Sequence, residues 1–322
     1  MGQPGKAGLT RVLVTGASGF VGRPTCEFLS ASGHAVTAAV RTSAAQTDRS
    51  VAIGDIGPQT DWTKALKDCD AVVHLAAHVH VMHGGSRHAA DFHRVNAEGS
   101  ERLAMQAAQA GVRRLIYLSS VKVNGEFTEG RAFTETDPPE PVDEYGISKA
   151  EAEKRLRAVA GDTGLEVVIL RPPLVYGPGV KANFLQLLRI VNAGMPLPFS
   201  TVDNRRSLLG VGNLAQAIEG CLVHPAAANR TFFVSDDHDV STPGLIREIA
   251  VALGRPARLF PFPMALLHGA GRVTGRAEQI ARLTGSLQID VSALKDALGW
   301  RPRHSLRQGL ERTAAWFRTQ SK

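Results

Sequence analysis

The chain has 322 residues, enough to bury a substantial core as one large domain or as two lobes. Its composition, 43% hydrophobic and 21% charged, is that of an ordinary globular protein, and no apolar run approaches the roughly 18 residues that a membrane-spanning helix needs. The net charge of 37 − 30 = +7 comes without a long basic block. We therefore expect neither a nucleic-acid nor a membrane partner, and the scattered arginines suit small anions such as diphosphates.

The amino-terminal sequence MGQPGKAGLT lacks the apolar core of a secretory signal, which predicts a cytoplasmic protein. The three cysteines, Cys26, Cys69 and Cys221, lie far apart and form no CxxC pair. This spacing predicts buried free thiols rather than disulfides or a thiolate metal site.

The first half of the chain alternates strand-like runs with helix-like stretches, the first of which extends from Phe20 to Ser32. The expected strands are apolar throughout and are, in chain order, RVLVTG, HAVTAAV, SVAIGD, DAVVHLAA, RRLIYLSS, LEVVILRP and, farther on, NRTFFVSD. Such runs are typical of a parallel sheet that is covered on both faces, and their alternation with helices predicts an α/β fold with a Rossmann-type doubly wound sheet.

We expect residues 9–173 to form this dinucleotide-binding domain, with segments near 205–235 returning to it. Residues 174–204 and 236–320 are richer in proline and glycine and are expected to form a smaller C-terminal substrate-binding lobe.

The loop after the first expected strand reads VLVTGASGFVG and opens a helix. Gly16 permits a tight turn, Gly19 lets phosphate oxygens approach the backbone, and Gly22 lets the helix pack on the strand. The N–H groups and the dipole at the helix start favour an anion. The loop, with Ser18 and Phe20, therefore predicts a bound dinucleotide diphosphate.

The end of the second expected strand, AVRTS, indicates which dinucleotide is bound. An acidic residue there would favour NAD(H), whereas this chain has Arg41, whose guanidinium can bind the 2′-phosphate of NADP(H). We therefore expect an NAD(P)(H) cofactor with NADP(H) favoured over NAD(H). Alternatively, Arg41 is only a solvated residue at a strand end.

Several motifs occur together in an order that resembles the extended short-chain dehydrogenase/reductases of the nucleotide-sugar epimerase/dehydratase group. The resemblance extends from about Leu9 to Trp300, on the motifs TGASGFVG, GDI, HLAA, SSVKVNGE, YGISK and RPPLVYGPG. The stretches SSVKVNGE, GVKANF, NRRSL and RLTGSLQID further resemble bacterial enzymes that act at C4 of UDP-N-acetylhexosamines, including reductases that make UDP-N-acetylquinovosamine.

The resemblance implies a catalytic group of Ser120, Tyr145 and Lys149. Tyr145 would be the general acid/base on the 4-oxygen of the sugar, and Ser120 would hydrogen-bond the same oxygen. A free phenol titrates near 10, so a neighbouring ammonium, together with an oxidised nicotinamide, would be needed to stabilise its phenolate. Lys149 is one helical turn from Tyr145 and would also bind the nicotinamide ribose.

Further positions have roles by resemblance only. Contacts with the cofactor are implied for Asp55, Ile56, Leu75, Ala76, Ala77 and Pro172, in addition to the loop residues, Arg41, Tyr145 and Lys149. Contacts with the diphosphate or the sugar are implied for Asn183, Arg206 and Arg282, in addition to Ser120. Asn96 would bend a helix, and a homodimer through the helices after HLAA and around YGISK would be usual for the family.

Three departures from the family pattern bear on the reaction. Val121 and Lys122 stand where dehydratases have an Asp–Glu pair, which disfavours 4,6-dehydration. Leu174 replaces an asparagine of many 4-epimerases, and Arg41 replaces the acid of tight NAD binders. We therefore expect an NAD(P)-dependent reduction of a UDP-4-keto-6-deoxy-N-acetylhexosamine, with UDP-glucose or UDP-N-acetylglucosamine 4-epimerisation as the alternative and a non-catalytic dinucleotide sensor as a remote one.

A histidine-rich stretch lies close to the expected active site. No carboxylate or cysteine at close spacing completes a ligand set for it, so no metal site is predicted. His80 and His83 could contact the sugar. The stretch contains His74, His78, His80, His83, His88 and His93.

Overall fold

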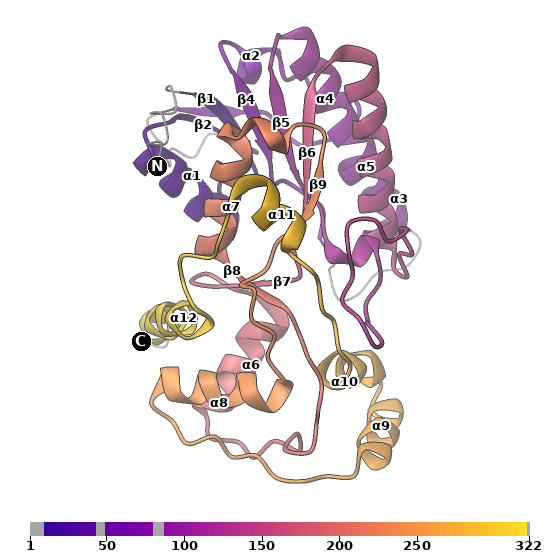
Figure 1. The fold of residues 1–322 in the computed structure, drawn as a ribbon, viewed down its shortest axis with the longest axis vertical. Coiled ribbons are helices and arrows are strands. Elements are labelled where there is room, and N and C mark those ends of the chain that lie inside the picture. The colour runs from indigo at the N-terminus through magenta and orange to yellow at the C-terminus, as the bar shows by residue number, and fades with distance from the viewer. Residues whose placement is uncertain (1–9, 43–48, 80–86, 321–322) are drawn as a thin grey trace.

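The computed structural model describes residues 10–42, 49–79 and 87–320 of the chain. Figure 1 shows a sheet flanked by helices at one end of the long axis and a mainly helical lobe at the other. The lobe contains the C-terminal helix, whereas the first strand lies in the sheet.

The main sheet has seven parallel strands in the order β3-β2-β1-β4-β5-β6-β9. All seven expected strands are present, which confirms the predicted α/β fold class. Their order reverses between β1 and β4, and ligands of such sheets bind at this switch point, beyond the carboxyl ends of the strands. The strands are β1 (Arg11–Thr15), β2 (Ala35–Val40), β3 (Ser50–Ala52), β4 (Ala71–His74), β5 (Arg114–Leu118), β6 (Glu166–Arg171) and β9 (Thr231–Phe233).

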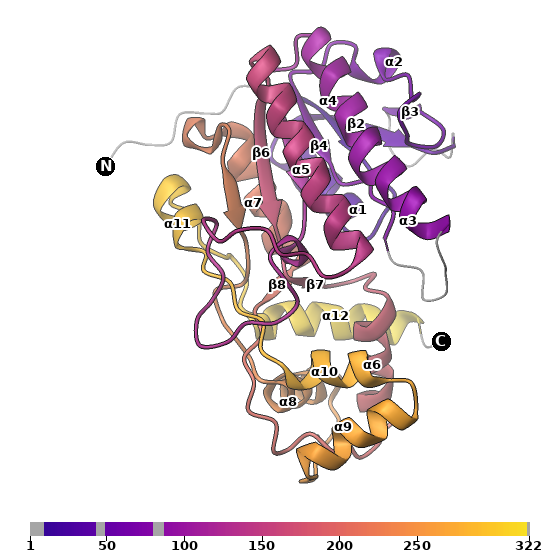
Figure 2. The same cartoon turned by 90° about the vertical axis from the view of Figure 1, so that its right-hand side faces the viewer.

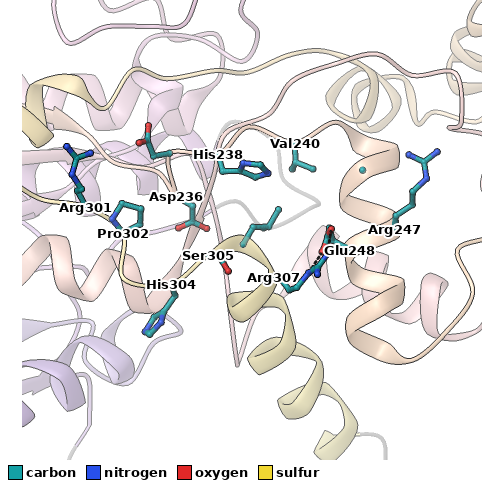
Figure 3. A pocket seen from close by; sticks show the side chains of 13 residues that line it. Asp236, His238, Val240, Arg247, Glu248, Arg301, Pro302, His304, Ser305 and Arg307 are labelled. Carbon is teal, nitrogen blue, oxygen red and sulfur yellow. Dashed lines mark hydrogen bonds and ion pairs between the residues drawn. The ribbon is translucent and has the colours of Figure 1, made fainter.

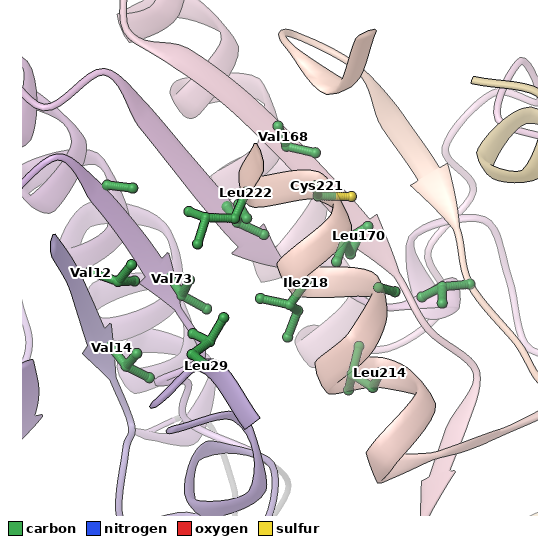
Figure 4. Packing of buried hydrophobic residues seen from close by; sticks show 14 of the residues in the cluster. Val12, Val14, Leu29, Val73, Val168, Leu170, Leu214, Ile218, Cys221 and Leu222 are labelled. Atoms are coloured by element: carbon green, nitrogen blue, oxygen red, sulfur yellow. The ribbon is translucent and has the colours of Figure 1, made fainter. Parts of the chain in front are cut away.

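Helices cover both faces of the sheet because successive strand residues point to opposite sides. Val12 and Val14 belong to one buried cluster with Leu29 of α1 (Gly22–Ala31) and Ile218 of α7 (Val211–Val223), as Figure 4 shows. Leu13 belongs to the cluster on the other face, which includes residues of α4 (Gly99–Gln109) and α5 (Glu144–Thr163).

Shorter elements complete this part of the chain. They are α2 (Thr63–Leu66), α3 (Arg87–Phe92), the π-helix η1 (His93–Glu98), and the 3-10 helices η2 (Val121–Val123) and η3 (Pro225–Ala227). The predicted helix from Phe20 to Ser32 is observed as α1, which begins two residues later because the glycine loop occupies its start.

The second lobe has its own core, in which Tyr176, Phe184 and Ile249 are buried. It contains a parallel pair of strands that the sequence did not predict, β7 (Leu174–Tyr176) and β8 (Leu208–Gly210). Its helices are α6 (Ala182–Asn192), α8 (Thr242–Leu253), α9 (Met264–Val273), α10 (Ala277–Thr284) and α12 (Leu306–Gln320). Between the last two, α11 (Ser292–Leu298) returns to the first core through Leu294.

No helix within the described ranges is both long and apolar enough to cross a bilayer.

Replacing Gly22 by alanine should destabilise the protein, because a Cβ there would lie 2.1 Å from the carbonyl oxygen of Gly16, a backbone atom that cannot move aside cheaply. We expect the free energy of unfolding to fall by about 2 kcal/mol or more. Gly161 of α5 is the matched control, since its Cβ would meet nothing within 4 Å. Gly161→Ala should raise the free energy by about 0.5–1 kcal/mol in urea unfolding, and equal effects of the two variants would contradict the close-packing argument.

Candidate functional site

The glycine loop is packed directly against the segment that follows β4. Gly16 has φ +66°, and a Cβ there would lie 2.8 Å from the backbone nitrogen of Ala76. The N–H of Gly19 donates to the carbonyl of Gly16 at 2.9 Å, which closes the turn. Ser18 and Gly19 are exposed, so a ligand can approach their backbone. Because its glycines have no side chain and it lies at the start of a ten-residue helix, this turn fits a dinucleotide diphosphate.

A buried chain of hydrogen bonds fixes the segment after β4. The Ser100 hydroxyl donates to a main-chain carbonyl of η1 at 2.6 Å, so its oxygen accepts from Nε2 of His74 at 2.9 Å. Nδ1 of His74 therefore accepts from the Thr15 hydroxyl at 2.6 Å. The Thr15 oxygen in turn accepts the N–H groups of Leu75 and Ala76, both at 3.2 Å. Burial, aided by a nearby ammonium, lowers the pKa of His74 to about 3, which keeps it neutral.

The sequence analysis assigned cofactor contacts to the segment HLAA but did not identify the two hydroxyls that hold it. Thr15 and Ser100 lie on β1 and α4, far from His74 in the sequence. The polar residue that ends the first strand was the available signal for Thr15, because a buried hydroxyl needs a partner.

At the expected adenosine end, Arg41 forms an ion pair with Asp55 at 3.1 Å. Both side chains are largely exposed, at 80% and 78%. The guanidinium that was expected to bind a 2′-phosphate thus contacts the Asp55 carboxylate, which was itself expected to contact the cofactor. Ile56 beside them is half-buried, and its Cγ2 would lie 2.7 Å from a Cβ at Gly99, at the start of α4.

Tyr145 and Lys149 lie one turn apart at the start of α5. Asp143 caps this helix by accepting the N–H of Gly146 at 2.7 Å. The Lys149 ammonium donates to the carbonyl of Leu118 at 2.7 Å and lies 5.9 Å from the centre of the Tyr145 ring. The structure therefore brings Tyr145 and Lys149 to the carboxyl end of β5, the strand that Ser119 and Ser120 follow.

The expected lowering of the Tyr145 pKa by Lys149 is not found in this structure. Burial raises the pKa of Tyr145 well above its ordinary value, and the charge of Asp143 raises it further. Burial also lowers the pKa of Lys149 to about 7, against the attraction of Glu153. The protein alone therefore holds the phenol in its protonated form, and a further positive charge is needed to make it a base.

The structure distinguishes the two serines that follow β5. Ser119 is buried and donates to Oε1 of Glu153 at 2.6 Å, so its hydroxyl is committed to the core. Ser120 is half-buried and precedes η2, and its oxygen accepts the N–H of Lys122 at 3.2 Å. Its hydroxyl proton has no acceptor among the described residues, so it can be donated to a ligand oxygen, as the predicted role of Ser120 requires. The carbonyl of Pro172 accepts the N–H of Val121 at 2.9 Å and holds this loop to the end of β6.

Asn96 lies within the π-helix η1 and is buried. Its amide accepts the N–H of His78 at 2.7 Å and donates to the carbonyl of His78 and to Ser148, each at 3.0 Å. Asn96 therefore connects the segment after β4 with the helix of Tyr145, in agreement with the expected structural role.

Of the three expected substrate contacts, the structure brings two together. Arg206 is mostly buried, and its Nη1 donates to the carbonyl of Arg282 at 2.7 Å. Burial, and then the charge of Arg282, lowers the pKa of Arg206. Asn183 is exposed in the first turn of α6 and makes no hydrogen bond with another described residue. Leu174, at the start of β7, is 39% exposed.

The sequence analysis missed an ionic bridge between the two lobes. Arg282 of α10 pairs with Glu126 at 2.9 Å, and Glu126 pairs with Lys122 at 2.7 Å. Lys122 also pairs with Asp143, the cap of α5. The lysine that replaces the acid of the dehydratases thus joins the loop of Ser120 to the helix of Tyr145. Nothing in the local sequence pattern pairs residues so distant along the chain.

The histidine-rich stretch is only partly described. His80 and His83 lie outside the described residues. Within the described ranges, no group of three His, Cys, Asp or Glu side chains could hold a metal ion.

A cavity of about 670 Å³ lies in the second lobe, between α8 and the start of α12 (Figure 3). It contains none of the predicted site residues, and part of its charge is already paired, since Arg307 binds Glu248 at 3.0 Å. Large pockets are the default place to look for a site, but here the catalytic side chains and the glycine turn lie elsewhere. We therefore place the candidate site at the carboxyl edge of the main sheet.

Comparison with known proteins gives relatives over nearly the whole chain. A UDP-glucose 4-epimerase of Vibrio cholerae is 45% identical over 311 residues, which cover 95% of this chain and 95% of that protein. An N-acetyl-alpha-D-glucosaminyl-diphospho-ditrans,octacis-undecaprenol 4-epimerase of Escherichia coli O157:H7 is 27% identical, over 94% of this chain and 93% of its own length. The solved structure of MoeE5 in complex with UDP-glucuronic acid and NAD has a TM-score of 0.78 at 27% identity, with 96% and 99% of the two chains covered.

The family model that matches this sequence is described as the NAD dependent epimerase/dehydratase family and covers residues 12–234. This range extends from the second residue of β1 to the residue after β9, so it contains nearly all of the main sheet, the glycine turn and the predicted catalytic group. The chain therefore belongs to the NAD-dependent epimerase/dehydratase family.

Proposed function

We propose that the protein is a UDP-sugar 4-epimerase that binds NAD(H). The observation that carries this proposal is the 45% identity, over 95% of both chains, to a UDP-glucose 4-epimerase. The sequence alone ranked the 4-keto reductase above the 4-epimerase. The relatives support the opposite order, and none of the similar proteins named above is a reductase of a 4-keto-6-deoxy sugar.

The chain's own residues can handle the oxygen at C4. Tyr145 takes the proton of the 4-hydroxyl as C4 is oxidised and gives it back to the ketone oxygen when C4 is reduced from the opposite face. Ser120 donates a hydrogen bond to the same oxygen and fixes its position. When bound, the dinucleotide accepts the hydride of C4 and returns it, so that no net redox change occurs.

The glycine loop and the segment after β4 would hold the dinucleotide diphosphate and nicotinamide, and Lys149 would donate to the nicotinamide ribose. Arg41 was expected to favour NADP(H). Its ion pair with Asp55 supports NAD(H) instead, because a guanidinium that stays on this carboxylate is not directed at a 2′-phosphate. Exposed pairs of this kind contribute about 0–1 kcal/mol, so the preference depends mainly on the family relationship.

Arg206 and Arg282 would bind the diphosphate of the UDP-sugar, and Asn183 would approach it from the start of α6. We also propose the homodimer that is usual for the family, through α4 and α5. Both helices expose apolar side chains that such an interface would cover, Met105 at 43% and Ile147 at 47%.

Purified protein should convert UDP-glucose or UDP-N-acetylglucosamine to its 4-epimer without added cofactor, because an epimerase regenerates the bound dinucleotide in each turnover. The products are separated by chromatography and identified by NMR. Turnover of a UDP-4-keto-6-deoxy sugar that needs stoichiometric NADH or NADPH, with no 4-epimer formed, would instead establish the reductase.

Tyr145→Phe and Ser120→Ala should each lower kcat about 10²–10⁴-fold, because proton transfer and the hydrogen bond at O4 are lost while the fold is kept. The neighbouring Ser119→Ala is the matched control. It removes a hydrogen bond to a buried carboxylate, so it should lower the free energy of unfolding by about 1–3 kcal/mol and leave most of kcat. A Ser119 variant that is folded but as inactive as the Ser120 variant would contradict the assignment.

Affinity of the cofactor-free protein for NAD should weaken as pH rises through about 7. Burial lowers the pKa of Lys149 to about 7, so below this pH the ammonium is present to donate, and above it the amine is neutral. The dissociation constant, measured by calorimetry, should rise by at most about tenfold per pH unit.

The control for this pH dependence lies on the same helix. Lys149→Met should bind NAD weakly at every pH, whereas Lys154→Met changes an exposed lysine of α5 and should keep the wild-type profile. An unchanged pH profile in Lys149→Met would show that another group is responsible.

A further inference from the structure

Helix α9 has an apolar face that points away from the protein. Its inner side contains the buried Leu267 and Gly271, which packs against Ile280 of α10. Its outer side contains Leu266, which is 61% exposed, and Val273, which is 90% exposed. These two residues are seven positions apart and therefore lie on one face. A surface helix normally presents polar residues to solvent. The exposed apolar residues on the outer face of α9 therefore indicate a binding surface.

Two neighbouring loops of the second lobe also expose apolar side chains. Met195 is 55% exposed and Phe260 is 39% exposed. Backbone hydrogen bonds join their loops, from Leu197 to the carbonyl of Arg258 at 2.8 Å and from Phe260 to the carbonyl of Leu197 at 3.1 Å. Figures 1 and 2 both place α9 at the end of the molecule farthest from the main sheet. We call Met195, Phe260, Leu266 and Val273 the α9 surface.

The segment that contains α9 is rich in positive charge. Residues 254–277 contain four arginines and neither aspartate nor glutamate, and the exposed Glu278 follows them. All four arginines are exposed, and none of them forms an ion pair with another described residue, in contrast to Arg282 or Arg307. The four are Arg255, Arg258, Arg272 and Arg276.

Although the composition led us to expect no membrane partner, we propose that the α9 surface docks on a membrane that carries anionic headgroups. The arginines bind phosphate groups of the lipids, while Phe260, Leu266 and Val273 enter the boundary between headgroups and acyl chains. Apolar side chains flanked by cations are the pattern that peripheral membrane contacts use. A projecting end of the molecule also suits a flat lipid surface better than a groove would.

A second copy of this chain fits the surface less well. A two-fold interface would place the same face of both copies together, and the arginines of one copy would then meet those of the other without a carboxylate to pair with. Docking at α9 also leaves the candidate site accessible. The site lies at the carboxyl edge of the main sheet, whereas α9 lies at the end of the second lobe that is farthest from this sheet.

Flotation of the full-length protein with vesicles tests the proposal. Vesicles of phosphatidylcholine mixed with phosphatidylglycerol should carry the wild-type protein upward, and vesicles of phosphatidylcholine alone should not. Arg272→Glu combined with Arg276→Glu should lower the partition coefficient at least about thirtyfold, because each cation near an anionic surface contributes about 1 kcal/mol. Leu266→Glu combined with Val273→Glu should abolish binding, and added salt should weaken the binding of the wild type.

A matched control is available at the opposite end of the molecule. Arg113→Glu changes an exposed arginine before β5 and should float like the wild type. Three outcomes would overturn the proposal: no binding of the wild type to anionic vesicles, equal flotation of the α9 variants, or a dimer in solution that the α9 variants dissociate.

Discussion

The catalytic geometry depends on one buried carboxylate, that of Glu153. It lies on α5, one turn after Lys149, and is fully buried. Arg171 of β6 binds it with two nitrogens, at 2.9 and 2.5 Å, and Ser119 at the end of β5 donates to it at 2.6 Å. Burial alone would raise the pKa of Glu153, but these hydrogen bonds and the charge of Arg171 outweigh it and lower the pKa. The carboxylate therefore stays charged and fixes α5 against two strand ends.

This anchor helps to place the two candidate catalytic hydroxyls, and it depends mainly on Arg171, which binds the carboxylate with two nitrogens, whereas Ser119 adds one hydrogen bond. Ser120 is attached to the strand that Ser119 ends, and Tyr145 is attached to the helix that Glu153 holds. The second connection, from Lys122 to Asp143, joins the same loop and helix at their other end. Because Glu126 extends this connection to Arg282, ion pairs link the loop of Ser120 to a residue that we propose as a ligand of the diphosphate.

Patterns that are local in the sequence predicted the fold well. The seven strands are continuous apolar runs, and the glycine turn follows the first of them, so both could be recognised without knowledge of distant contacts. The short pair β7 and β8 was missed because each strand has only three residues and pairs across more than thirty intervening positions. The same limit applies to the site: the family motifs indicate Ser120, Tyr145 and Lys149, whereas the contacts of Thr15 with His74 and of Glu126 with Arg282 depend on the folded chain.

The pKa of Tyr145 was only partly predictable from the sequence. A lysine one turn away suggests an acidified phenol, but burial acts on both groups and favours the neutral form of each. The Lys149 ammonium is also directed at the carbonyl of Leu118 rather than at the phenol oxygen. In the protein alone the Tyr145 phenol is therefore a proton donor and not an acceptor. An epimerase needs both states of the same phenol within one turnover, so the acceptor state must come from positive charge that is present only in the loaded site.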